Sequence, residues 1–167
     1  MGKGTLVLAA FLLCGCAAAQ PAEDEPKAVI EVAPEVGRSL SGEGWSAGPG
    51  FAIEVTPVER WLEIEAGVAR SFGGHSGEWD TDLLLKKPWS LSKRAEVMVG
   101  AGPAWERSER NGSAANSLAA EFALDFMFWP AARHRWGWFL EPVYDLGVGR
   151  GKPQSLGIGF GLLIGVH

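Results

Sequence analysis

The chain has 167 residues, of which 47% are hydrophobic and 21% are charged, and its formal net charge is -5. This length is typical of one domain, and the apolar content excludes an intrinsically disordered chain. The negative charge argues against a nucleic-acid-binding protein, because such proteins neutralise phosphates with lysine and arginine.

The N-terminal residues predict a secretory signal peptide. An apolar run from Leu6 to Leu13 is followed by the small residues Ala17 to Ala19. The run is too short to cross a bilayer, and small residues are what a signal peptidase requires. We therefore expect residues 1–19 to be removed on secretion.

A second processing signal overlaps the first. The segment Leu13-Cys14-Gly15-Cys16 resembles the lipobox of bacterial lipoproteins, in which Cys16 would carry the lipid. Cleavage after Ala19 and lipidation of Cys16 both stay open on the sequence. In either case the folded part contains no cysteine, which excludes disulfides and thiolate metal sites there.

Residues 20–47 predict a flexible, acidic segment ahead of the folded domain. Prolines interrupt it, and it carries six acidic residues. Lys27 to Ala33 alternates briefly between polar and apolar residues, so this stretch, or Ser39 to Ser46, is a candidate first strand. We expect the folded domain to span residues 48–167.

From Gly50 onward, apolar and polar residues alternate in each run between turn signals. Leu118 and Phe122 fall on one face of such a run, for example, and Glu121 and Asp125 fall on the other. A period of two residues indicates strands with one apolar and one polar face. The pattern predicts seven strands after residue 50, to which the preceding segment adds a candidate eighth.

Turn residues separate these strands, and we expect short and long connections to alternate. The shorter set, at one end of the strands, comprises Pro57 to Arg60, Lys87 to Arg94 and Pro130 to Arg135. The longer, polar set comprises Gly73 to Glu78 and Ser108 to Asn116. Such an arrangement is typical of an up-and-down barrel with turns at one end and loops at the other.

Two kinds of β-barrel fit an amphipathic all-β chain of this size. A lipocalin-like soluble barrel turns its apolar face inward around a ligand, whereas a membrane barrel turns it outward to lipid. Glycines on the acidic face favour the membrane barrel, because they suit a crowded interior. Lysines and arginines, among them Arg60 and Lys86, are assigned to strand ends and turns, which favours it too.

The two faces of the strands supply the candidate site residues. The acidic face is expected to line the lumen with Glu54, Glu63, Glu65, Asp80, Asp82, Glu96, Glu121, Asp125, Glu141 and Asp145. Aromatic residues at strand ends are expected to form two belts at the membrane interfaces, with Trp61, Trp79, Trp105, Trp129, Trp136, Trp138 and Tyr144.

The pattern resembles the small eight-stranded outer-membrane β-barrels of Gram-negative bacteria, the OmpA-like and OmpX-like superfamily, and its uncharacterised short members in particular. Gly159 to Val166 is similar to the C-terminal signal read by the barrel assembly machinery, although Val166-His167 replaces the usual terminal aromatic residue. The resemblance covers roughly Gly48 to His167. It implies a single antiparallel up-and-down transmembrane β-barrel of about eight strands, secreted to the outer membrane, inserted by that machinery and monomeric in lipid.

The expected function is structural or surface-interacting, non-enzymatic, and without cofactor or metal. The second interpretation is a soluble or lipid-tethered periplasmic barrel that binds an apolar ligand. The third is an enzyme that modifies envelope lipids, with His75, Ser76 and Asp80 as its candidate residues. Neighbouring residues on a strand point to opposite sides, which argues against His75 and Ser76 as a catalytic pair.

The row of acidic residues is the most unusual feature of the sequence. Carboxylates packed without partners must be protonated, hold water or attract cations. We expect arginine and lysine side chains to reach them from the two mouths of the barrel, and a cation-attracting lumen is the alternative.

Overall fold

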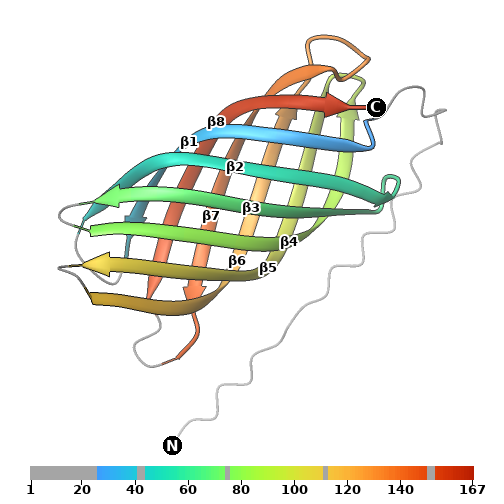
Figure 1. The fold of residues 1–167 in the computed structure, drawn as a ribbon. Coiled ribbons are helices and arrows are strands. Elements are labelled where there is room, and N and C mark those ends of the chain that lie inside the picture. Colours follow the sequence, from blue (N-terminus) through green and yellow to red (C-terminus); the bar gives the residue numbers. More distant parts are fainter. Residues whose placement is uncertain (1–25, 41–43, 74–75, 111–112, 150–152) are drawn as a thin grey trace, which may run out of the picture.

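The chain folds into a single closed β-barrel in a computed structural model that describes residues 26–40, 44–73, 76–110, 113–149 and 153–167. Eight strands lie within these ranges. They are β1 (Ala28–Ser39), β2 (Trp45–Val58), β3 (Leu62–Gly73), β4 (Ser76–Ser92), β5 (Ala95–Arg110), β6 (Ser113–Phe128), β7 (Trp136–Gly147) and β8 (Gln154–Val166). Each strand pairs antiparallel with its neighbours in sequence, and β1 closes the ring against β8 (Figure 1). The predicted fold class, an antiparallel up-and-down barrel, is confirmed. The described residues contain no helix that is long and apolar enough to span a membrane.

The two ends of the barrel differ in the connections they carry. The first residue of β1, Ala28, pairs in register with Val166 of β8, so both ends of the strand sequence meet at one end of the barrel (Figure 1). We call this the terminal end. The opposite end, where β1 is joined to β2, β3 to β4, β5 to β6 and β7 to β8, is the distal end.

The barrel begins earlier in the chain than the sequence predicts. The candidate strand at Lys27 to Ala33 is present and continues to Ser39, so the domain boundary at residue 48 is wrong. Proline fits an extended backbone, and Pro34 pairs in register with Pro49 of β2, so the two missing N–H donors coincide in the ladder. The predicted signal peptide, residues 1–19, and Cys16 lie outside the described residues.

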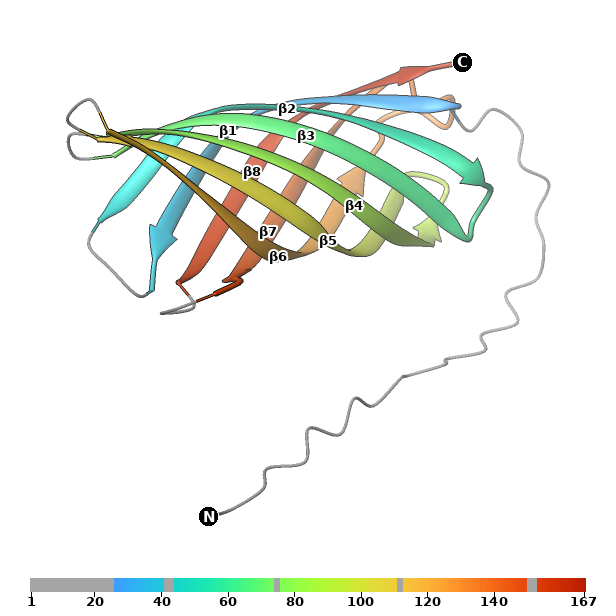
Figure 2. The same ribbon diagram turned by 60° about the horizontal axis from the view of Figure 1, so that its bottom comes forward.

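The predicted polar loops at the distal end are mostly strand. β3 runs to Gly73 and β4 starts at Ser76, while β5 runs to Arg110 and β6 starts at Ser113. These two hairpins reach farthest at the distal end of the barrel (Figure 2). Polar residues alone suggested loops, but each extended strand still finds backbone partners on its neighbour. The β3–β4 and β5–β6 hairpins therefore project at the distal end because their strands extend farther, and not because long loops join them.

The predicted connection from Lys87 to Arg94 is also shorter than expected. β4 continues to Ser92, and Pro88 pairs in register with Met98 of β5. The turn itself contains only residues 93 and 94, because the ladder between β4 and β5 extends through Pro88. The connections predicted at Pro57 to Arg60 and Pro130 to Arg135 agree with the ends of β2 and β6.

The outer surface of the barrel is apolar. On β8, for example, Leu156, Ile158, Phe160, Leu162 and Ile164 are 46–59% exposed, and their neighbours in sequence face inward. Large apolar side chains are similarly exposed on the other strands. This orientation is that of a membrane barrel and contradicts the lipocalin-like alternative, which requires the apolar face inside.

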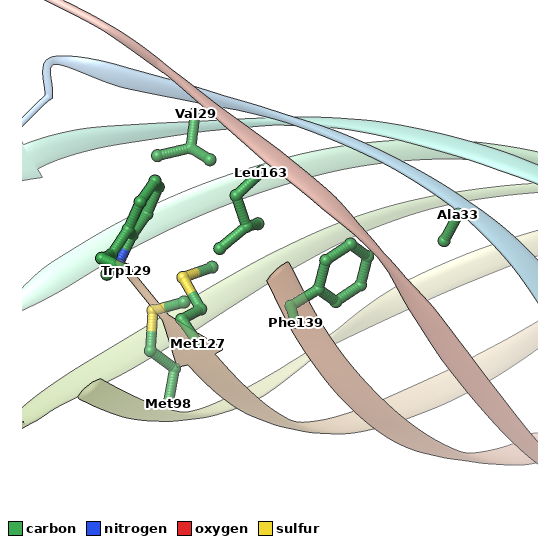
Figure 3. Close-up of a cluster of buried hydrophobic side chains, with 7 residues drawn as sticks. All are labelled: Val29, Ala33, Met98, Met127, Trp129, Phe139 and Leu163. Carbon is green, nitrogen blue, oxygen red and sulfur yellow. The ribbon is translucent and has the colours of Figure 1, made fainter. Parts of the chain in front are cut away.

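Apolar side chains also fill the lumen at the terminal end. We call Val29, Met98, Met127, Trp129 and Leu163 the apolar plug, and each of them is at most 7% exposed. Their side chains converge from β1, β5, β8 and the end of β6, with Phe139 and Ala33 lying farther along the barrel (Figure 3). The plug closes the lumen on the side where the chain ends meet.

Candidate functional site

All ten acidic residues predicted for the lumen lie on the less exposed face of their strands, which lines the barrel interior. Glu54, Glu65 and Asp125 are buried, and the other seven are of intermediate exposure. Strict alternation explains this placement, because one residue in two must face inward in a closed barrel.

Among the residues that the structure describes, one lysine occupies the middle of the lumen. Lys86 on β4 is fully buried, and its Nζ forms salt bridges with Glu65, with Asp125 Oδ2 at 2.8 Å and with Glu141 Oε1 at 3.1 Å. These partners come from β3, β6 and β7, so one ammonium group joins strands across the barrel. The assignment of Lys86 to a strand end is wrong, because β4 continues for six residues beyond it to Ser92.

A second group of carboxylates adjoins this ion cluster and shares Glu65 with it. Oxygens of Glu31, Glu54 and Glu65 lie within 4.8 Å of one another, and all three residues are at most 3% exposed. Among the described residues, Glu31 Oε1 and both carboxylate oxygens of Glu54 have no hydrogen-bond partner. We call these three residues the glutamate triad.

Four inward-facing acids among the described residues are absent from the predicted ten. Glu78 and Glu106 lie near the distal rim, and Glu31 and Glu35 belong to the segment expected to be flexible. For Glu31 and Glu35, the alternation of polar and apolar residues is nevertheless present in the sequence. Glu31, Ala33 and Glu35 alternate with Val32 and Val36, and the two valines face outward at 47% and 40% exposure. Pro34 interrupts this short run and Pro26 precedes it, so the alternation is difficult to recognise in the sequence.

The distal half of the lumen is acidic throughout. Its carboxylates are Glu35, Glu78, Asp80, Asp82, Glu106, Glu121 and Asp145. Hydroxyl groups satisfy two of them: Ser155 Oγ donates to Asp145 Oδ2 at 2.9 Å, and Ser117 Oγ donates to Glu106 Oε2 at 2.7 Å. No described lysine or arginine side chain forms a salt bridge with this group. Near the rim, burial and the charge of neighbouring Glu106 raise the pKa of Glu78 above its ordinary value.

A small cavity connects the two regions of the lumen. It has a volume of about 30 Å³, and its walls include Glu31 and Glu141 on one side and Glu35 and Asp82 on the other. This space holds a water molecule or two, but no lipid or other apolar ligand. A second cavity, of about 20 Å³, lies beside the apolar plug near Trp129 and His134.

Most of the predicted belt residues project from the barrel wall. Trp61, Trp79, Trp105, Trp136 and Trp138 are 39–62% exposed. Tyr144 is of intermediate exposure on the outer face of β7, and its ring lies 6.3 Å from that of Phe122.

Trp129 is an exception, and its assignment to a belt is wrong. It is 2% exposed, and its ring stacks on His134 at 4.8 Å between centroids. β6 ends at Phe128, so Trp129 is free of the strand alternation and turns into the barrel end, where it completes the apolar plug.

The described residues hold no arrangement suited to nucleophilic catalysis. His75 and the side chain of Ser76 lie outside the described part of the chain, so the candidate set with Asp80 is not placed. His134 Nε2 lies 3.1 Å from the carbonyl oxygen of Lys93 and its ring packs on Trp129, which is a structural role. The titratable groups that the described lumen brings together are carboxylates and one lysine.

Comparison with solved structures finds the same fold in bacterial outer-membrane proteins. Neisserial surface protein A (NspA) superposes with a TM-score of 0.65 at 10% identity, over 83% of this chain and 95% of that chain. OprG from Pseudomonas aeruginosa gives 0.63 at 9% identity, over 86% and 97% of the two chains. Ail, the attachment invasion locus protein of Yersinia pestis, gives 0.52 at 11% identity, over 84% and 99%.

In sequence, no family model and no curated protein matches the chain. The shared feature is therefore the fold, which is that of small outer-membrane β-barrels, as the sequence pattern predicts. The neighbours are Gram-negative outer-membrane proteins, and this supports the predicted localisation.

Proposed function

We propose that the chain is an integral outer-membrane β-barrel with a structural or surface-interaction role and no enzymatic activity. The observation that carries this proposal is a closed barrel with apolar side chains outside and carboxylates inside. Lipid solvates such a surface, because the closed ladder pairs the backbone groups of the wall and leaves apolar side chains facing the hydrocarbon.

Side chains fill the lumen, which argues against a pore through which solutes diffuse. The apolar plug fills it at the terminal end, and the salt bridges of Lys86 cross its middle. An eight-stranded barrel is just wide enough for side chains to fill. We therefore infer a packed barrel that displays a surface rather than conducts solutes.

The distal hairpins are the surface that this barrel would display outside the cell. The β3–β4 and β5–β6 hairpins reach beyond the rest of the distal end (Figure 2). Arg70 lies over the rings of Phe72 and Trp79 at 5.4 and 4.8 Å, and this stacking stiffens the base of the β3–β4 hairpin. Two neighbours in fold carry the names surface protein and attachment invasion locus protein, which favours the same role here.

Lipid and the barrel assembly machinery are the proposed partners, and the proposed state is a monomer. Strand β8 ends at Val166, which pairs in register with Ala28 of β1, and this pairing of β8 with β1 closes the ring. Closure by β8 removes the exposed strand edge that would otherwise recruit a second barrel.

Labelling of intact cells tests both the location and the orientation. We would place a single cysteine at Ala114, on β6 near the distal end, or at Lys93, in the turn at the terminal end; both side chains are exposed. A membrane-impermeant maleimide should label Ala114→Cys on intact cells, and Lys93→Cys only after the outer membrane is opened. The unmodified protein shows the background from any remaining native thiol.

Fractionation of the same cells completes the experiment. The protein should sediment with the outer membrane and require detergent for extraction. A protein that is released with the soluble periplasm, or equal labelling of both cysteines on intact cells, would overturn the proposal.

A further inference from the structure

We propose that the glutamate triad, Glu31, Glu54 and Glu65, binds one divalent cation of the calcium type inside the barrel. The triad lies in the middle of the lumen, above the apolar plug, where β1, β2 and β3 are adjacent. The register of these strands assembles it, because Glu54 pairs with Glu65 across the β2–β3 ladder.

The positions of the oxygen atoms suit one ion. Calcium binds carboxylate oxygens at about 2.3–2.6 Å, so two oxygens on one ion lie at most about 5.2 Å apart. One oxygen from each glutamate falls within 4.8 Å of the other two. The three side chains can therefore share a single ion without movement of the strands.

The unsatisfied oxygens provide independent support. Glu54 is 1% exposed, and no N–H, hydroxyl or ammonium group of the described residues donates to its carboxylate oxygens, which lie beside the carboxyl group of Glu63. Glu31 is 2% exposed, and its Oε1 is unpartnered in the same way. Burial of such a group is unfavourable unless a partner replaces the lost water. A cation supplies that partner for both residues at once.

The balance of charge points the same way. Lys86 is the ammonium group of this region, and its Nζ contacts Glu65, Asp125 and Glu141 rather than Glu31 or Glu54. Among the described residues, four buried carboxylates and the partly exposed Glu141 thus share one positive charge. A divalent ion beside the triad removes much of the excess negative charge that Lys86 leaves.

The structure also provides a small cavity at the edge of the triad, on its distal side. The cavity of about 30 Å³ borders Glu31 and extends to Glu35 and Asp82 in the acidic distal half. Carboxylates on this side attract cations from the distal mouth. If the glutamates bind with both of their oxygens, one or two waters in the cavity complete the six to eight oxygen ligands that calcium takes, whereas magnesium demands a stricter geometry than three glutamates from a twisted sheet provide.

Calorimetry with calcium alone is the direct test. The protein is refolded into zwitterionic detergent without lipopolysaccharide, stripped with a chelator and titrated at neutral pH in potassium chloride. We expect one calcium ion per barrel, and Glu54→Gln should weaken binding at least about tenfold. Asp145→Asn is the matched control, because it also removes one lumen carboxylate but lies at the distal side, where Ser155 satisfies it.

Melting of the same samples gives a second readout. Calcium should raise the unfolding temperature of the unmodified protein and of Asp145→Asn, but not that of Glu54→Gln, because a ligand stabilises only the state that binds it. Glu31→Gln replaces Glu54→Gln if the latter does not fold. Absence of calcium binding to the unmodified protein overturns the proposal. Equal weakening by Asp145→Asn also overturns it, since the lumen would then hold a diffuse ion cloud rather than a site.

Discussion

At the residue scale, the packing of the lumen depends on Lys86. Its side chain is fully buried, and three carboxylates from three strands contact its ammonium group. Buried ion pairs stabilise little relative to apolar packing, but the loss of one partner leaves the others buried and uncompensated. Lys86 is therefore the position where a single change should disturb the barrel interior most.

Lys86→Met should destabilise the folded barrel by about 3–5 kcal/mol at neutral pH, because Glu65, Asp125 and Glu141 lose their counter-ion. The midpoint of urea unfolding, read by the gel shift between folded and unfolded forms, measures the effect. Lys87→Met is the matched control. Lys87 is the next residue on the outer face, where its Nζ donates to the carbonyl oxygen of Arg60 at 2.5 Å. Equal midpoints for the two variants would contradict the central role of Lys86.

Glu78 provides a pH-dependent prediction at the rim. Burial and the charges of Glu106 and Asp145 raise the pKa of Glu78 above 4.5 in the folded state. The folded state thus favours the protonated form, and this contribution to stability is present below pH 4.5 and is lost as the pH rises through the folded-state pKa. Glu78→Gln should therefore be more stable than the unmodified protein at pH 7.5 and equal to it near pH 4.

Urea unfolding at the two pH values measures this difference. Glu109→Gln is the control, because Glu109 is exposed and pairs with Arg107 at 3.4 Å. A stability gain from Glu78→Gln that is the same at both pH values would show that charge is not its cause.

At the scale of the element, β8 shows how a strand fits a crowded lumen. Its inward positions 157, 159, 161 and 165 are glycines, and large apolar residues occupy the outward positions. The space beside these glycines differs along the strand. A Cβ at Gly161 would lie 2.6 Å from Ala33 Cβ and would also meet the carbonyl oxygen of Val32, whereas one at Gly157 would lie 3.7 Å from its nearest neighbour, Val143.

Two alanine substitutions on β8 should therefore have opposite effects. Gly161→Ala should destabilise the barrel by about 1–3 kcal/mol, because the β1 backbone must move to admit a methyl group. Gly157→Ala should be neutral or stabilising by up to about 1 kcal/mol, since glycine loses more backbone entropy on folding than alanine. Unfolding midpoints in urea measure both changes, and equal effects would show that the close contact with β1 is relaxed in solution.

At the scale of the whole molecule, the barrel has three levels. The apolar plug closes the terminal end, the ion cluster of Lys86 and the glutamate triad cross the middle, and carboxylates line the distal half. Outside, a continuous apolar surface covers the strands. Contact with lipid requires apolar side chains on the outer surface, whereas the lumen requires that its charges be compensated. A charged substitution should therefore destabilise the outer surface, and the loss of a charged partner should destabilise the lumen.

Leu162→Arg tests the outer surface. Leu162 is 59% exposed on the outer face of β8, in register with Trp138 of β7, and an arginine facing lipid there should cost up to about 2–4 kcal/mol of folding free energy, the cost at the bilayer midplane. Val148→Arg should cost much less, because Val148 follows the end of β7 at the distal end and is 69% exposed. Folding yield into lipid vesicles and urea midpoints measure both variants. Normal folding of Leu162→Arg would exclude contact of β8 with lipid.

The sequence by itself determined the strands and the identity of their faces. Alternation is a property of neighbouring residues, so Phe122 and Asp125 could be assigned to opposite sides without knowledge of any partner strand. The same reasoning failed where polar residues or prolines continue a strand, as at Pro34 and Pro88, because pairing with the next strand decides such positions.

Only the tertiary structure decided which inward residues meet. Closure and register bring Lys86 to Asp125 and Glu141, and place Glu31 beside Glu54 and Glu65. These residues are far apart in the sequence, and a shift in register by two residues would preserve every face while changing every contact. Trp129 turned inward for a related reason, since it lies past the end of β6, where alternation no longer fixes a direction.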